Sequence, residues 1–158
     1  MASNRTAVVT MPTDTQILIT RQFAAPQHLV FQAWTAPELI RRWWGGDRGE
    51  VTSVVVDLRV GGSWRYVMQA NAGFEVAFRG EYREIVPNER IVTTDVFEGM
   101  PEAEALTTLS LSETNGRTTL ALLVEHTSQE HRDAHINSGM EDGMQASMDQ
   151  IEQVALSI

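Results

Sequence analysis

The sequence predicts an α+β fold in which an antiparallel β-sheet bends around one long C-terminal helix. Two observations carry this prediction. Across residues 129–158 apolar residues recur every three or four positions, which is the spacing of one helix face. Between residues 50 and 125 the sequence reads instead as alternating segments separated by turn residues, a pattern typical of strands. A helix with one apolar stripe must lie against another element. The sheet is therefore its expected partner.

The first strand is predicted over Gln16–Phe23, where apolar and polar residues alternate. Two short helices should follow, over residues 27–34 and 37–44, because their apolar positions have helical spacing. Pro37 suits the first turn of the second helix, since proline is tolerated where no intrahelical amide bond is required. One strand followed by two short helices is the predicted opening of the domain.

Further strands are predicted along the middle of the chain, each bounded by turn residues such as Gly61-Gly62 and Asn115-Gly116. The short connections between them imply antiparallel neighbours. The strands are expected near residues 50–58, 63–69, 74–86, 90–98, 104–113 and 117–126.

The C-terminal helix is predicted to begin at Thr127, which forms a capping-box pattern with Glu130. Its stripe consists of Ile136, Met140, Met144, Met148, Ile151, Ala155 and Ile158. The opposite face is polar, includes Glu152, and is expected to face water. Methionine side chains repack easily, and Gly139 and Gly143 indicate close approach of another backbone or unfilled space. The stripe is therefore either a core seam or the adaptable wall of a cavity.

Aromatic rows on the predicted sheet would face this stripe. Trp64, Tyr66 and Met68 share one face of a strand, and Phe78 and Tyr82 share one face of the next. Such rows line a binding chamber or fill a core, because both require the same residue types. The predicted ligand-binding set is Trp34, Trp44, Arg59, Trp64, Tyr66, Phe78, Tyr82, Met140, Met144 and Met148.

Composition limits the classes of partner. The chain lacks cysteine, which excludes disulfides, thiol catalysis and thiolate metal sites. With 12 basic and 21 acidic residues the net charge is −9, which argues against nucleic acid or an anionic membrane as the main partner. No segment has the length and apolarity of a membrane span. We expect a cytoplasmic monomer or homodimer, with a flexible N-terminal tail over residues 1–14 and a single domain over residues 15–158.

Candidate metal-binding and anion-binding residues are few. His131 and His135 have the i, i+4 spacing that lets two imidazoles share a metal, and His126 is nearby, but no further ligand completes a site. Arg59 could present its guanidinium to an anionic ligand, or could be held by a carboxylate such as that of Asp57. We therefore expect no metal and no cofactor.

No nucleophile or nucleotide-binding motif is recognisable, so the sequence favours a non-enzymatic role. A cofactor-independent enzyme would need polar groups inside the chamber. The candidates for that role are Arg59, Tyr66, Tyr82, Thr107 and His126.

Several stretches together resemble the domain family named after the activator of the heat-shock-protein-90 ATPase. The resemblance extends over about residues 16–156. The stretches that carry it are VFQAWT at 30–35, WWG at 43–45, DLRVGGSW at 57–64, FRGEYREI at 78–85 and Gly143-Met144. The family belongs to the SRPBCC group, which is similar to START and Bet v 1-like (birch-pollen allergen) proteins. The resemblance implies a helix-grip fold, a strongly curved antiparallel sheet around the C-terminal helix with two short helices closing one end. Many relatives carry tryptophan at the position of Met144, so a cavity here should be softer and more open.

Three functions are compatible with these observations. The favoured one is a binding protein that holds a small hydrophobic or amphipathic molecule, such as a lipid, sterol or aromatic compound, between the Met stripe and the aromatic rows. The family name suggests an interaction module that modulates a chaperone-type ATPase in the stress response. Similarity to polyketide cyclases in the wider group suggests a cofactor-independent cyclase or lyase acting on a polyketide-like or aromatic substrate.

Overall fold

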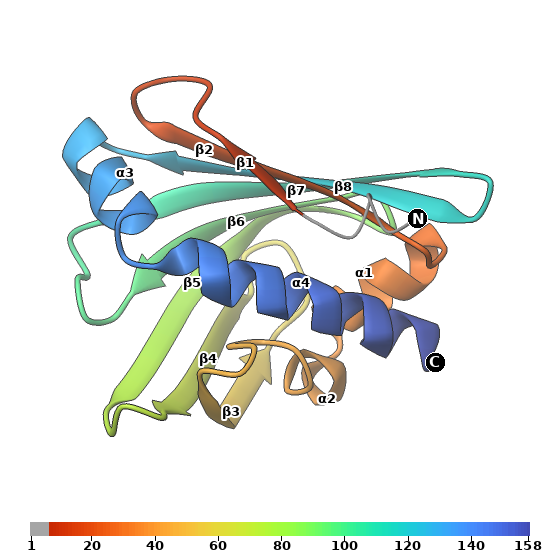
Figure 1. The fold of residues 1–158 in the computed structure, drawn as a ribbon, viewed down its shortest axis with the longest axis horizontal. Helices are drawn as coiled ribbons and strands as arrows, with labels where there is room; N and C mark the ends of the chain where they lie inside the picture. Colours follow the sequence, from red (N-terminus) through yellow and green to blue (C-terminus); the bar gives the residue numbers. More distant parts are fainter. Residues whose placement is uncertain (1–6) are drawn as a thin grey trace.

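The computed structural model describes residues 7–158. Its elements are β1 (Val8–Thr10), β2 (Gln16–Phe23), α1 (Gln27–Thr35), α2 (Pro37–Ile40), β3 (Gly49–Val56), β4 (Ser63–Ala70), β5 (Glu75–Val86), β6 (Arg90–Phe97), β7 (Ala105–Thr114), β8 (Arg117–His126), α3 (Gln129–Ile136) and α4 (Met140–Leu156). One eight-stranded sheet has the order β1-β2-β8-β7-β6-β5-β4-β3. The sheet curves around α4, with α1 and α2 at one end and α3 at the other (Figure 1). The predicted α+β helix-grip architecture is confirmed.

The strands predicted from residue 16 to residue 126 are all present, and their ends differ from the predicted ones by at most two residues. Each pairs antiparallel with its neighbours. The β7–β8 hairpin shows why the prediction succeeds. Asn115 and Gly116, with φ of 54° and 77°, supply the two left-handed residues of the tight turn between Thr114 and Arg117. Turn residues and alternation are local signals, so they can be recognised from the sequence alone.

A strand also forms within the segment predicted to be a flexible tail. Val8–Thr10 pairs with the stretch Leu18 to Thr20 of β2. Just before it, Ala7 is buried, and its backbone N–H and C=O bond the side-chain amide of Gln145 on α4 at 3.0 and 2.8 Å. Three residues are too few for alternation to reveal a strand. Residues 1–6 of the predicted tail lie outside the described residues.

The predicted single C-terminal helix is two helices, so this part of the prediction was wrong. The chain turns between α3 and α4 at Gly139, whose φ of 83° lies in the left-handed region that glycine adopts without steric cost. The cap also differs, because the Ser128 hydroxyl accepts the amide N–H of His131. An apolar stripe can keep its spacing across a bend, and for that reason spacing alone did not reveal the break.

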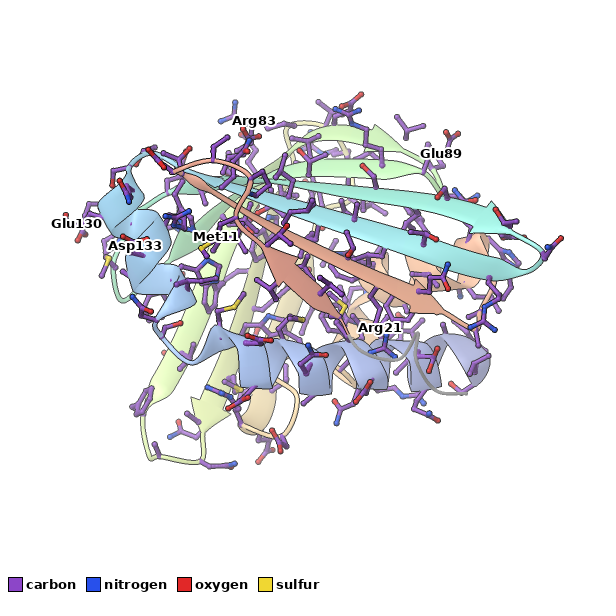
Figure 2. All side chains as sticks on the ribbon, turned by 45° about the horizontal axis from the view of Figure 1, so that its top comes forward. Met11, Arg21, Arg83, Glu89, Glu130 and Asp133 are labelled. Atoms are coloured by element: carbon purple, nitrogen blue, oxygen red, sulfur yellow. The ribbon has the colours of Figure 1, made fainter. Side chains whose placement is uncertain are left out.

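The C-terminal half of α4 packs on the sheet and on α1. Met148, Ile151 and Ala155 are buried there, as the stripe predicted. Glu152, by contrast, is only 5% exposed and does not face water as expected. Its carboxylate accepts the backbone N–H of Ala24 and lies beside the guanidinium of Arg21, which extends from β2 toward α4 (Figure 2). β2 and the residue just after it therefore lie against this side of the helix. None of the helices formed by residues 7–158 combines the length and apolarity needed to cross a membrane.

Candidate functional site

A cavity of about 620 Å³ lies between the concave face of the sheet and the N-terminal half of α4. This volume is within the usual range of small-molecule sites. Its wall is mainly apolar and combines aromatic side chains from the sheet with methionines. All four tryptophans of the chain line it. The methionines on the wall are Met68, Met100, Met140, Met144 and Met148.

All of the predicted ligand-binding residues except Arg59 line this cavity. These are Trp34, Trp44, Trp64, Tyr66, Phe78, Tyr82, Met140, Met144 and Met148. Arg59 lies in the turn between β3 and β4, where its side chain is 69% exposed and its Nε is 2.9 Å from Oδ2 of Asp57. Arg59 does not line the cavity because it lies in an exposed turn, where its partner is the carboxylate of Asp57. A place on the wall does not by itself establish a role in binding.

The two adjacent tryptophans Trp43 and Trp44 have different roles in the wall. Trp43 is buried, donates its indole N–H to the carbonyl of Ala33 at 2.8 Å, and packs against Trp34. Trp44 turns toward the sheet and meets Tyr66 edge-on, with ring centroids 5.5 Å apart. Trp43 therefore fixes the segment after α2, and that anchoring lets Trp44 form part of the cavity wall.

Arg48 closes one part of the wall between the loop after α2 and the start of α4. Its guanidinium donates to the carbonyl of Gly139 at 2.8 Å. At Gly143 a Cβ would lie 2.9 Å from Nε of Arg48, so the glycine makes room for this side chain. Gly143 was predicted to mark close approach of another backbone or unfilled space, but the group that approaches it is the side chain of Arg48.

A polar cluster lies inside the otherwise apolar cavity. The two carboxylate oxygens of Asp95 accept hydrogen bonds from the hydroxyls of Thr93 and Thr107, each at 2.8 Å. Tyr66 and Tyr82 line the cavity beside them. Burial raises the pKa of Asp95 to about 6, and the threonine hydrogen bonds oppose part of that rise. Burial also raises the pKa of Tyr82 to about 12, so this phenol stays protonated at neutral pH.

Asp95 and Thr93 were missed by the sequence analysis, whereas Tyr66, Tyr82 and Thr107 were named in it. A signal was available in β6, whose alternation puts Ile91, Thr93, Asp95 and Phe97 on one face. A carboxylate in the middle of an inward-facing row is unusual, and it indicates that polar partners lie inside the sheet. Only the pairing of Thr93 with Thr107 across β6 and β7 shows which hydroxyls it meets.

Two histidines form a second polar group on the wall. Nε2 of His126 on β8 lies 3.0 Å from Nδ1 of His135 on α3, and the rings stand nearly perpendicular. Burial and the neighbouring His126 lower the pKa of His135 to about 4, so this imidazole is neutral at pH 7. Within residues 7–158 no group of three or more His, Asp or Glu side chains is placed to hold a metal ion.

Comparison with solved structures places the fold among bacterial proteins of similar length. A Rhodobacter sphaeroides protein is 24% identical with a TM-score of 0.88, over 96% of this chain and 99% of that one. A Mycobacterium smegmatis protein is 24% identical with a TM-score of 0.83, over 94% and 96%. A Chromobacterium violaceum protein is 29% identical with a TM-score of 0.79, over 90% and 98%.

Comparison with curated proteins gave no match. Comparison with protein families gave a match over most of the chain. Residues 24–155 match the family described as "Activator of Hsp90 ATPase homolog 1-like protein". The matched range includes both short helices, the strands β3 to β8 and nearly all of α4. The chain therefore belongs to the family of activator of Hsp90 ATPase homolog 1-like proteins.

Proposed function

We propose that the protein binds a small hydrophobic or amphipathic molecule in the cavity between the sheet and α4. The observation that supports this best is the cavity itself, about 620 Å³ with a wall that is mainly apolar. Each 100 Å² of apolar surface removed from water contributes about 2.5 kcal/mol. Association costs roughly 4–15 kcal/mol, so a ligand has to bury several hundred Å² to bind well. A cavity of this size can enclose such a molecule.

The methionines of the wall indicate that the cavity can accept ligands of more than one shape. Met140, Met144 and Met148 present unbranched side chains along one face of α4, opposite the aromatic rings of β4 and β5. Thioethers adjust their rotamers at low cost and make favourable contacts with aromatic rings. The wall is suited to elongated aliphatic or flat aromatic ligands, which it can follow by repacking.

Filling the cavity should abolish ligand-induced stabilisation. We expect at least one class in a panel of long-chain alkyl, sterol and polycyclic aromatic compounds to raise the free energy of unfolding by about 2.7 kcal/mol at 100 times its dissociation constant. Met144→Trp places a larger, stiffer ring in the cavity, so the stabilisation should be lost. The measurement is thermal unfolding with and without each compound.

The matched control is Met11→Trp, because Met11 is 53% exposed and does not line the cavity. That variant should keep the full ligand shift. If no class stabilises the wild-type protein, or if Met144→Trp responds as the wild type does, the cavity is not the binding site.

A cofactor-independent enzyme acting on an aromatic or polyketide-like substrate is the second candidate. Asp95 favours it, because a carboxyl with its pKa raised to about 6 lies inside the cavity beside Tyr82, as in sites of acid–base catalysis. Mass spectrometry of a compound that has been incubated with the protein and then released separates binding from catalysis. A binding protein returns the compound unchanged, whereas an enzyme returns it altered. Modulation of a chaperone ATPase rests on the family description alone and on no feature of this cavity.

A further inference from the structure

Asp95 is the one carboxylate on the cavity wall of the described chain, and no basic side chain pairs with it there. Each of its oxygens accepts one threonine hydroxyl. A carboxylate oxygen offers about two acceptor positions, so each oxygen can take a further donor. A buried charge without a countercharge is costly, and protein cores usually pair it. The cavity therefore presents an acceptor for which residues 7–158 supply no countercharge.

The groups around the cavity also favour a cation near Asp95. Beyond the effect of burial, the charge of Asp95 raises the pKa of both Tyr66 on β4 and Tyr82 on β5, so the two phenols lie close to its carboxylate. The ring of Tyr66 packs against those of Trp44 and Trp64, with centroids 5.5 and 4.7 Å away. Aromatic faces attract cations, particularly where water is excluded. This end of the cavity combines one negative charge with a surface of electron-rich rings.

The other charged or titratable groups on the wall do not provide the missing countercharge. His126 projects from β8, and His131 and His135 project from α3. The low pKa of His135 keeps it neutral at pH 7. The guanidinium of Arg48 donates a hydrogen bond to the carbonyl of Gly139, at the start of α4. A ligand carboxylate would be repelled by Asp95, and a ligand hydroxyl would donate a hydrogen bond without supplying charge.

We propose that the cavity takes an apolar molecule with one protonated amine, whose ammonium group donates to Asp95 while its apolar part lies along the methionines of α4. This inference rests on the proposed function, since it requires the cavity to hold a ligand. The threonines position the carboxylate, and the ammonium group adds the donors and the charge that the site lacks.

Three compounds that differ only in the head group test the proposal. Decylamine, decanol and decanoate are unbranched compounds with ten carbons each, and their binding is measured by calorimetric titration at pH 7.5. We expect decylamine to bind at least tenfold more tightly than decanol, and decanoate to bind most weakly. In Asp95→Asn the preference for the amine should disappear while decanol binding stays. Asp14→Asn, which removes one exposed carboxylate outside the cavity, should keep the preference.

The pH dependence of amine affinity provides an independent test of the role of Asp95. Decylamine stays protonated throughout, whereas Asp95 gains a proton as the pH falls through about 6, so amine affinity should drop between pH 7.5 and 5. Decanol affinity should change little. His131→Gln should show the same pH dependence as the wild type, because the proposal assigns the effect to Asp95.

The outcomes separate this inference from the proposed function. Equal binding of the amine and the alcohol, or an amine preference that persists in Asp95→Asn, overturns the inference and leaves the cavity as a binding site. Preference for decanoate that is lost in Arg48→Gln overturns it in favour of an anionic ligand. Absence of binding by all three compounds, together with no response in the wider panel, contradicts both proposals.

Discussion

Replacing Arg21 with alanine is expected to lower the free energy of unfolding by about 3–5 kcal/mol. The Arg21 side chain is fully buried, and its guanidinium lies 2.7 Å from Oδ1 of Asp149 and 3.5 Å from Oε1 of Glu152. It also lies over the ring of Phe23, 5.2 Å from the centroid. Removing it leaves Glu152 buried with only the Ala24 amide as donor, and an uncompensated buried carboxylate is costly. Chemical denaturation at pH 7 measures the loss.

The matched control is Arg83→Ala, which breaks an exposed ion pair between Arg83 and Glu81 with an N–O distance of 2.9 Å. Exposed pairs contribute at most about 1 kcal/mol, so this variant should remain close to the wild type. The double variant Arg21→Met with Glu152→Gln removes both buried charges and should recover most of the stability that Arg21→Ala loses. A loss in Arg21→Ala no larger than in Arg83→Ala would show that the buried pair does not anchor α4 to β2.

Replacing Asp95 with asparagine is expected to stabilise the protein at pH 8 by about 2–3 kcal/mol. Folding raises the pKa of Asp95 from its ordinary value of 3.8 to about 6, so the folded state favours the protonated carboxyl. Each pKa unit corresponds to about 1.4 kcal/mol. The contribution of Asp95 is fully favourable below the unfolded pKa and is lost as the pH rises through about 6. Asparagine is never charged, and its amide can still bond Thr93 and Thr107.

The measurement is the difference in free energy of unfolding between Asp95→Asn and the wild type at several pH values. The gain should be present above pH 7, fall between pH 6 and pH 4, and vanish near pH 3.5. Comparing the two proteins at each pH cancels the other titrating groups. Asp14→Asn provides the control and should change stability little at any pH. A variant that is less stable than the wild type at pH 8 would mean that the ionised carboxylate is well compensated.

The expected cost of the Asp95 charge to stability at neutral pH bears on the function of this residue. Natural sequences keep such residues mainly where activity or binding requires them. The same carboxylate that destabilises the empty protein above pH 6 becomes favourable once a cation pairs with it. The expected stabilisation by Asp95→Asn and the expected loss of amine preference are therefore two consequences of one unpaired charge.

The fold was predictable because its signals are local. Alternation along Gln16–Phe23 and the left-handed pair Asn115-Gly116 mark a strand and a turn without reference to the rest of the chain. The bend at Gly139 was missed because the apolar spacing continues through it. The burial of Glu152 was missed for a different reason, since it depends on Arg21, which is far away in sequence.

The apolar part of the site was also predictable, whereas its polar part was not. The alternation of Trp64, Tyr66, Phe78 and Tyr82 fixes which rings share a face, so their place on the wall follows from the sequence. The environment of Asp95 depends on the pairing of β6 with β7. Arg59 was included in the predicted ligand-binding set, but it lies in an exposed turn and pairs with Asp57, the alternative that the sequence also offered.

Tryptophan fluorescence tests the central claim most directly, because all four tryptophans line the cavity. A bromine atom quenches indole emission on contact, so bromoalkyl amines and alcohols report entry into this space. We predict quenching that saturates with concentration, is reversed by the unbrominated compound, and is stronger for the amine at equal concentration. Quenching that rises linearly without saturation, and that the unbrominated compounds do not reverse, would contradict a ligand-binding cavity in this protein.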